Sequence, residues 1–216
     1  MSEERTRVRR LPEKQVTDRA ALDAVLDAGR VAHVAVLDDE RRPYVLPVAY
    51  ARDGDAVLVH GSTGSRLFRT LSRGAPTCLT VTLYEGLVLA RSAFESSMHY
   101  RSAMVLGRAT PLTGDDAVAA LRVLVEHLMP GRWSDVRHPS AKELAATLVL
   151  SLPLTEWSLK VSAGDPDDDP ADLDLPVWAG VVPVREVLGA PRPAPDLPAA
   201  TPVPAYVRSW GADTET

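Results

Sequence analysis

Cysteine is nearly absent from this chain of 216 residues, which carries only Cys78. A single thiol excludes an intrachain disulfide framework and a metal centre built from several cysteines. Because Cys78 lies within an alternating apolar run, we expect its thiol to be buried and chemically inert. Histidine pairs with the spacing of HExxH are also absent, and we expect no metal ion.

Long apolar runs are missing as well. No segment approaches the ~20 apolar residues that a membrane-spanning helix requires. The N-terminal sequence MSEERTRVRR is charged and has no apolar centre, unlike a secretory signal. The formal net charge of −5 argues against nucleic acid or an acidic membrane as the main partner. Together these observations predict a soluble, cytoplasmic protein that binds neither nucleic acid nor membrane.

Several well-known functional motifs are absent too. The chain has no GxxxxGK(S/T) phosphate loop and no GxGxxG dinucleotide fingerprint. It also lacks the GxSxG sequence around a nucleophilic serine, so hydrolase chemistry has no support.

The most informative stretch covers residues 56–74, where AVLVH is followed by GSTGS and RLFRTLSRG. It predicts a strand ending at His60, a loop of small residues, and a basic amphipathic helix that stops at Gly74. Glycine in the loop lets successive N–H groups converge, and Ser65 and Arg66 add a hydroxyl and a forked cation. The loop is therefore either a phosphate cradle or an ordinary solvated turn.

The remaining pattern predicts a mainly β fold with flanking helices. Consecutive strands joined by tight turns favour an antiparallel barrel, whose interior would be filled by side chains. A large ligand would then lie on its outer surface or at a subunit interface. We expect an extended N-terminal arm over residues 1–16, one domain over 17–184, and a proline-rich tail over 185–216. The expected strands are 31–37, 44–51, 56–60, 77–84, 87–94, 100–112, a region over 148–161, and 177–184. The expected helices are 17–28, the one that follows residue 65, one from 113 to Pro130-Gly131, and 141–147.

Four segments carry a family resemblance: PYVLPVAY (43–50), VHGSTGSRLFRTLSRGAPTCLTV (59–81), HYRSAMVLGRATPL (99–112) and WAGVVP (178–183). Their order and spacing resemble the pyridoxamine 5'-phosphate oxidase-like family, the flavin-binding split barrels. The nearest resemblance is to the flavin-nucleotide-binding subgroup that includes the nitroimidazole reductases. It covers about residues 10–185.

The resemblance implies a homodimeric, six-to-eight-stranded antiparallel split β-barrel with FMN at the subunit interface. Backbone groups of one strand would contact the flavin ring, and the loop after His60 would hold the phosphate. Arg101 and Ser102 would approach from the facing subunit or the strand at the ring edge, and Trp178 would stack on the flavin or serve as core or interface packing. The implied cofactor-binding residues are Val45, Leu46, Pro47, Val48, His60, Gly61, Ser65, Arg66, Arg101, Ser102 and Trp178.

Two departures from the family pattern bear on the reaction. Pyridoxamine phosphate oxidases end in an Arg-rich motif with a His-Asp-Arg element, whereas this chain has an acidic loop over 164–176 and a proline-rich tail. Ser102 stands where those oxidases carry glutamine. We therefore do not expect oxidation of vitamin B6.

The predicted function is an FMN-dependent oxidoreductase that passes hydride from a donor such as reduced nicotinamide to a small molecule. His60 is the candidate catalytic residue, as a group that orients or protonates the substrate, although a structural histidine satisfied by backbone fits the same position. One alternative is a haem-binding or haem-degrading protein with His60 as the axial ligand. Others are a non-catalytic flavin carrier or sensor, and a deazaflavin in place of FMN.

Overall fold

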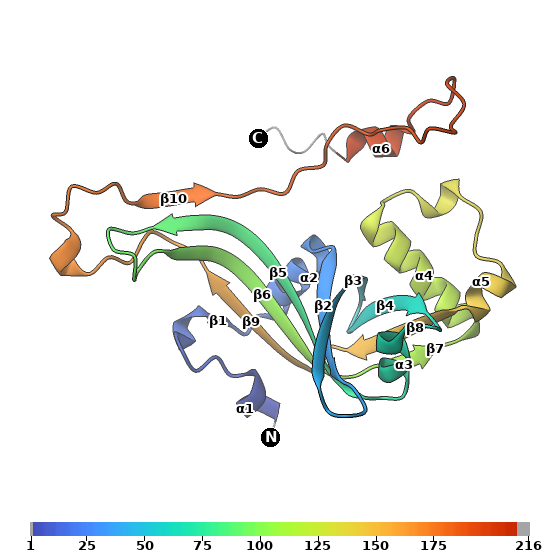
Figure 1. Ribbon diagram of the computed structural model, residues 1–216, viewed down its shortest axis with the longest axis horizontal. Helices are drawn as coiled ribbons and strands as arrows, with labels where there is room; N and C mark the ends of the chain where they lie inside the picture. Colours follow the sequence, from blue (N-terminus) through green and yellow to red (C-terminus); the bar gives the residue numbers. More distant parts are fainter. Residues whose placement is uncertain (1, 211–216) are drawn as a thin grey trace.

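Antiparallel pairing joins every strand of the chain into one strongly curved sheet, as the computed structural model shows for residues 2–210 (Figure 1). The strand order is β1-β9-β6-β5-β2-β3-β4-β8-β7, and β10 pairs with the outer part of β5. Within the described residues the ten strands are β1 (Gln15–Val16), β2 (Val31–Leu37), β3 (Pro43–Asp53), β4 (Ala56–Ser62), β5 (Pro76–Leu89), β6 (Ser97–Arg108), β7 (Thr110–Leu112), β8 (Thr147–Pro153), β9 (Glu156–Ser162) and β10 (Gly180–Pro183).

The sheet departs from the predicted pattern most clearly at residues 77–94. We expected two strands with a turn at Glu85-Gly86, but β5 continues to Leu89 and absorbs one extra residue as a bulge between Tyr84 and Gly86. Glycine fits this point because β10 passes close by: a Cβ on Gly86 would lie 3.1 Å from the carbonyl oxygen of Val182. Glu85-Gly86 is compatible with either a bulge or a turn, and here the pairing of β10 with β5 favours the bulge.

Short elements account for the other differences. The expected strand 100–112 is divided between β6 and β7, and the region 148–161 is a hairpin of β8 and β9. Within residues 2–210 the N-terminal arm is not wholly extended, because it holds the helix α1 (Ser2–Thr6), the 3₁₀ helix η1 (Pro12–Lys14) and β1. These additions raise the strand count above the expected six to eight.

Two helices close the interior of the sheet. The apolar face of α2 (Arg19–Ala28) buries Leu22, Val25 and Leu26 in the interior core. Helix α3 (Arg66–Ser72) buries Leu67, Phe68 and Leu71 in the same core. The cap of α2 is Asp18 rather than the neighbouring threonine, because its carboxylate accepts the N–H groups of Ala20 and Ala21. The interior is therefore filled by side chains, as the sequence predicted.

A second layer covers part of the outer face of the sheet. Helix α4 (Gly114–Leu128) packs on β3, β4 and β8, where Ala51, Leu58 and Val149 form a core with its buried residues and Trp133. The short helix α5 (Ala141–Ala145) follows within the expected range 141–147, and Ser140 and Glu143 form a capping box at its start. The 3₁₀ helix η2 (Trp133–Asp135) lies between these two helices in the chain.

Cys78 lies on β5 and is half-buried rather than fully buried. Burial raises the pKa of its thiol, which disfavours the reactive thiolate.

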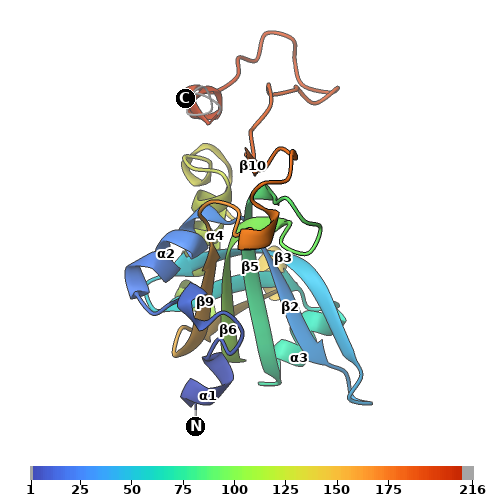
Figure 2. The same cartoon turned by 90° about the vertical axis from the view of Figure 1, so that its left-hand side faces the viewer.

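The C-terminal segment runs along the outside of the molecule (Figures 1 and 2). After the 3₁₀ helix η3 (Pro170–Asp172), β10 pairs with β5, and residues 184–204, here called the strap, lead to α6 (Ala205–Ser209). Helix α6 attaches beside the loop after α4, where the Tyr206 hydroxyl donates to Asp135 at 2.7 Å. Of the predicted tail, residues 211–216 lie outside the described residues.

Among residues 2–210, no helix has the length and apolar character that crossing a bilayer would need.

Tyr50 provides a direct test of the interior. It is fully buried on β3, and its hydroxyl donates to the carbonyl oxygen of Leu26 at 2.7 Å. Tyr50→Phe removes this donor and leaves a buried carbonyl short of a partner, so we expect the free energy of unfolding to fall by about 1 kcal/mol. Urea denaturation of the variant measures the loss. Tyr84→Phe, at a side chain that is 43% exposed, is the control and should leave the midpoint unchanged; equal losses would contradict the role of this hydrogen bond.

Candidate functional site

The two strands β3 and β4 separate halfway along their length. They pair only from Tyr50↔Val59 to Asp53↔Ala56, whereas β4 stays paired with β8 as far as Ser62. The first part of β3, residues 43–49, pairs with β2 alone among the described strands. We call the opening between residues 43–49 of β3 and residues 60–62 of β4 the seam. It leaves one backbone edge of β3 without a strand partner.

Helix α3 lies at this seam because of a close contact with β4. The ring of Phe68 rests directly against Gly61, where a Cβ atom would lie 2.2 Å from the ring. Phe68, Leu67 and Leu71 are all buried, so the apolar face of the helix is fixed. The GSTGS loop between β4 and α3 is therefore held at the end of the seam.

The N–H groups of the loop are hydrogen-bonded differently from those of the phosphate cradle that the sequence suggested. The N–H of Thr63 donates to the carbonyl of Ala146 at 3.0 Å, and the N–H of Ser65 donates to the carbonyl of Ser62 at 2.9 Å. The N–H of Gly64 donates to the Ser62 hydroxyl at 3.1 Å. These three donors are engaged within the chain, so they do not converge on an open position. The hydroxyl of Ser65 makes no capping hydrogen bond to α3, which leaves it for a ligand.

Arg66 is exposed at the start of α3 and forms no ion pair with any described residue. Its guanidinium carbon lies 4.3 Å from the centre of the Tyr44 ring, at the end of β3. Sequence reasoning did not single out Tyr44, although it directly precedes the predicted residues 45–48. Ser65 and Arg66 thus place a free hydroxyl and an uncompensated positive charge at one end of the seam.

His60 lies on the face of β4 that α4 covers. Leu58 belongs to the outer core with α4, and His60, two residues later, points to the same side. Its Nδ1 is buried without a hydrogen-bond partner, and burial lowers the pKa of the imidazole, which favours the neutral form. It opens onto a cavity of about 450 Å³ that is also lined by Leu121, Arg137, Pro139, Glu143 and Thr147.

Residues 45–48 alternate between the two sides of β3. Val45 and Pro47 share the outer side with Ala51, and hence with His60, whereas Leu46 and Val48 point to the inner side. Val45 and Leu46 are 53% and 43% exposed, unusual for large apolar residues in mid-strand. Backbone and side chains of this segment are therefore accessible beside the seam.

The other predicted residues lie on different strands. Arg101 and Ser102 are on β6, which β5 and β2 separate from β3, so the distance across the sheet is about 14 Å. Arg101 forms an ion pair with Glu85, and the Ser102 hydroxyl lies 3.3 Å from that of Thr82. Trp178 precedes β10, is 65% exposed and stacks over Gly180. Within one chain, these three residues do not join the group at the seam.

A second cavity, of about 850 Å³, lies along the outer side of α4. It is lined by residues of α4, including His127, together with Trp133 and His138. His127 Nε2 lies 2.7 Å from the carbonyl oxygen of Gly29, and the rings of His138 and Trp133 stack at 4.8 Å. No spacing in the sequence indicated this cavity, because tertiary contacts such as the stacking of His138 on Trp133 form its lining. Within residues 2–210, no group of three side chains has a metal-binding arrangement.

Comparison with known proteins agrees with this geometry. A family model described as pyridoxamine 5'-phosphate oxidase matches residues 18–161. The chain belongs to this family. No curated protein matches it. The predicted fold class, a mainly β antiparallel split barrel with flanking helices, is confirmed.

Two solved structures resemble nearly the whole chain. The FAD and heme binding protein from Mycobacterium smegmatis is 44% identical, with a TM-score of 0.89 over 92% of this chain and 97% of that one. The flavocytochrome Anf3 from Azotobacter vinelandii is 40% identical, with a TM-score of 0.89 over 96% of each chain. A putative 5-nitroimidazole antibiotic resistance protein from Bacteroides thetaiotaomicron is 22% identical, with a TM-score of 0.59 over 68% of this chain and 86% of that one, and shares the fold.

Gly61→Ala tests the contact that positions the loop. The added methyl group would overlap the Phe68 ring, so we expect the free energy of unfolding to fall by about 1–3 kcal/mol. Thermal and urea unfolding measure the change. Gly64→Ala is the matched control, because its Cβ would lie 3.5 Å from the nearest atom, the Ser62 hydroxyl oxygen. Similar losses in the two variants would show that the close contact at Gly61 is unimportant.

Proposed function

We propose that the chain binds a flavin nucleotide along the seam, with its phosphate held by Ser65 and Arg66. The observation that carries this proposal is the uncompensated charge of Arg66 beside the unpartnered edge of β3. A guanidinium with all its donors available is well suited to a phosphate group. The family and the names of the Mycobacterium smegmatis and Azotobacter vinelandii relatives support the same class of ligand.

The flavin ring would lie beside residues 45–48, as the resemblance implies. Their free backbone edge offers N–H and C=O groups to the polar edge of a ring, and Val45 and Pro47 offer apolar contact on the outer side. Gly61 packs against Phe68 and so brings α3 and the loop close, and its contact with the flavin ring stays part of this proposal.

The nucleotide is FMN according to the sequence resemblance, whereas the name of the Mycobacterium smegmatis relative specifies FAD and that of the Azotobacter vinelandii relative specifies only a flavocytochrome. Each carries a phosphate on the ribityl chain, which Ser65 and Arg66 would bind in the same way. Release of the bound cofactor followed by mass spectrometry separates FMN, FAD and a deazaflavin.

The proposed site is completed by a second copy of the chain. Strands β2, β5 and β6 expose apolar side chains on the outer face of the sheet, beyond the strands on which α4 packs, including Val31, Tyr84, Leu87 and Met98. A homodimer would cover this row, because large apolar patches are rarely left in water. It would also bring Arg101, Ser102 and Trp178 of the second copy toward the ring.

We further propose an oxidoreductase. A bound flavin supplies hydride and electron transfer, and the protein supplies position and electrostatics. Arg66 neutralises the phosphate, the backbone of residues 45–48 orients the ring, and the neutral His60 offers a proton donor or acceptor to a small substrate. A reduced nicotinamide is the proposed donor, and a non-catalytic flavin carrier is the alternative. Action in the cytoplasm without nucleic-acid or membrane partners stays a prediction.

Haem is the second candidate ligand, with His60 as its axial residue. Three observations favour it: the unpartnered buried ring nitrogen, the neutral imidazole and the adjoining cavity of about 450 Å³. A neutral imidazole is the form that binds iron. Both close relatives are named for haem or a cytochrome as well as a flavin, so the two candidates are compatible.

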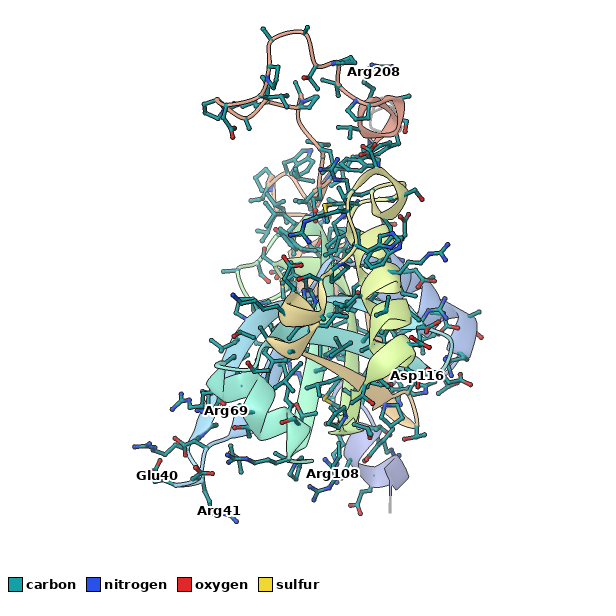
Figure 3. All side chains as sticks on the ribbon, turned by 90° about the vertical axis from the view of Figure 1, so that its right-hand side faces the viewer. Glu40, Arg41, Arg69, Arg108, Asp116 and Arg208 are labelled. Carbon is teal, nitrogen blue, oxygen red and sulfur yellow. The ribbon has the colours of Figure 1, made fainter. Side chains whose placement is uncertain are left out.

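Arg66→Ala tests the flavin proposal. Loss of a charged hydrogen-bond donor should weaken FMN and FAD binding about ten- to one-hundred-fold. Fluorescence titration of the flavin-stripped full-length chain measures the dissociation constants. Arg69→Ala is the control, because Arg69 is an exposed arginine of the same helix that projects into solvent (Figure 3). Unchanged affinity in the Arg66 variant would contradict the phosphate assignment.

His60→Ala tests the haem proposal. The variant should lose the Soret absorption of haem-reconstituted protein while keeping its bound flavin. Acidification should release haem from the unaltered chain only at a pH below the ordinary histidine pKa of about 6.5, because burial lowers the pKa of His60 and imidazolium has no lone pair for iron. His138→Ala, in the larger cavity along α4, should change neither spectrum. Loss of the Soret band in that variant alone would move the haem site to the α4 cavity.

A further inference from the structure

Tyr44 combines a ring that packs in the interior with a hydroxyl that has no partner. Its ring packs against the interior core, and its hydroxyl is buried without a hydrogen-bond partner. A buried, unsatisfied hydroxyl is destabilising, and phenylalanine would avoid it. The guanidinium carbon of Arg66 lies over this ring, 4.3 Å from its centre.

The way in which Arg66 is held differs from that of other arginines in the chain. Arg101 is paired with Glu85, Arg137 with Glu143, and Arg52 with Asp27. In each of those pairs the carboxylate occupies N–H donors and cancels the charge. The contact with the Tyr44 ring engages no carboxylate, so the N–H donors of Arg66 and its full positive charge stay available to a ligand.

We infer that Tyr44 is the positioning residue for phosphate recognition: it holds Arg66 at the end of the seam in the orientation that a phosphorylated ligand needs. This inference rests on the proposed flavin site and adds a specificity determinant to it. A free arginine side chain loses rotamer entropy when it binds an anion. Tyr44 reduces that loss in advance, so binding of the phosphate is tighter than the charge alone would give.

The effect of Tyr44 on binding affinity should be limited to phosphorylated flavins. Riboflavin has the same ring system as FMN but no phosphate, so it does not use Arg66. Tyr44→Leu, which removes the aromatic face, should weaken FMN binding about two- to five-fold and leave riboflavin binding unchanged. Tyr44→Phe keeps the face and should bind both ligands as the unaltered chain does.

The experiment is a fluorescence titration of flavin-stripped, full-length protein with FMN and with riboflavin. It compares the unaltered chain, Tyr44→Leu, Tyr44→Phe, Arg66→Ala and the double variant Tyr44→Leu/Arg66→Ala. In the double variant, Tyr44→Leu should have no further effect, because its partner is already gone. Circular dichroism and thermal melting establish that each variant is folded.

The outcomes are distinct. A selective loss of FMN affinity in Tyr44→Leu that disappears in the Arg66→Ala background supports the inference. Equal losses for FMN and riboflavin would assign Tyr44 a purely structural role and overturn it. If Arg66→Ala weakens FMN binding but Tyr44→Leu does not, Tyr44 has no positioning role while the proposed function stands. If Arg66→Ala has no effect, the phosphate assignment itself fails.

Discussion

The parting of β3 from β4 is the constraint on which the rest of the site depends. Beyond Tyr50 and Val59 the two strands no longer pair, and just past that point α3 packs Phe68 against the face of Gly61. The apolar contact that holds α3 in place thus brings Arg66 to the end of a β3 edge that has no strand partner among the described residues. A strand edge is normally covered or blocked in a folded protein. Here the edge is left open next to a free cation, a combination that suits a flat ligand with an anionic tail.

Much of this arrangement follows from local sequence. The strand ending near His60, the small-residue loop and the helix with Leu67, Phe68 and Leu71 on one face form as expected, because short-range periodicity determines them. The capping box at Ser140 is likewise a local property. Ser65 and Arg66 lie together at the seam for the same reason, since both are fixed by the start of one helix.

What the sequence could not supply are properties that depend on distant neighbours. Glu85-Gly86 has turn chemistry, yet the approach of β10 makes it a bulge within one long strand. The N–H groups of the loop were expected to face a ligand, but Ala146, more than eighty residues away in the chain, accepts one of them. Arg101 and Ser102 belong to a matching family segment, whereas only the strand order shows that they stand three strands away from the seam. Tyr44 went unnoticed because stacking between side chains leaves no periodic signal.

The strap after β10 is fastened unequally at its two ends. Four ladder pairs with β5 hold its start, whereas its far end depends on a five-residue helix and a few side-chain hydrogen bonds, such as that from Trp210 to the carbonyl of Pro130. Local opening begins where the fewest buried contacts must break. We therefore expect any local opening of the strap to begin at α6, while β10 stays in register. Detachment of this kind would free more than twenty residues as a tether without disturbing the barrel.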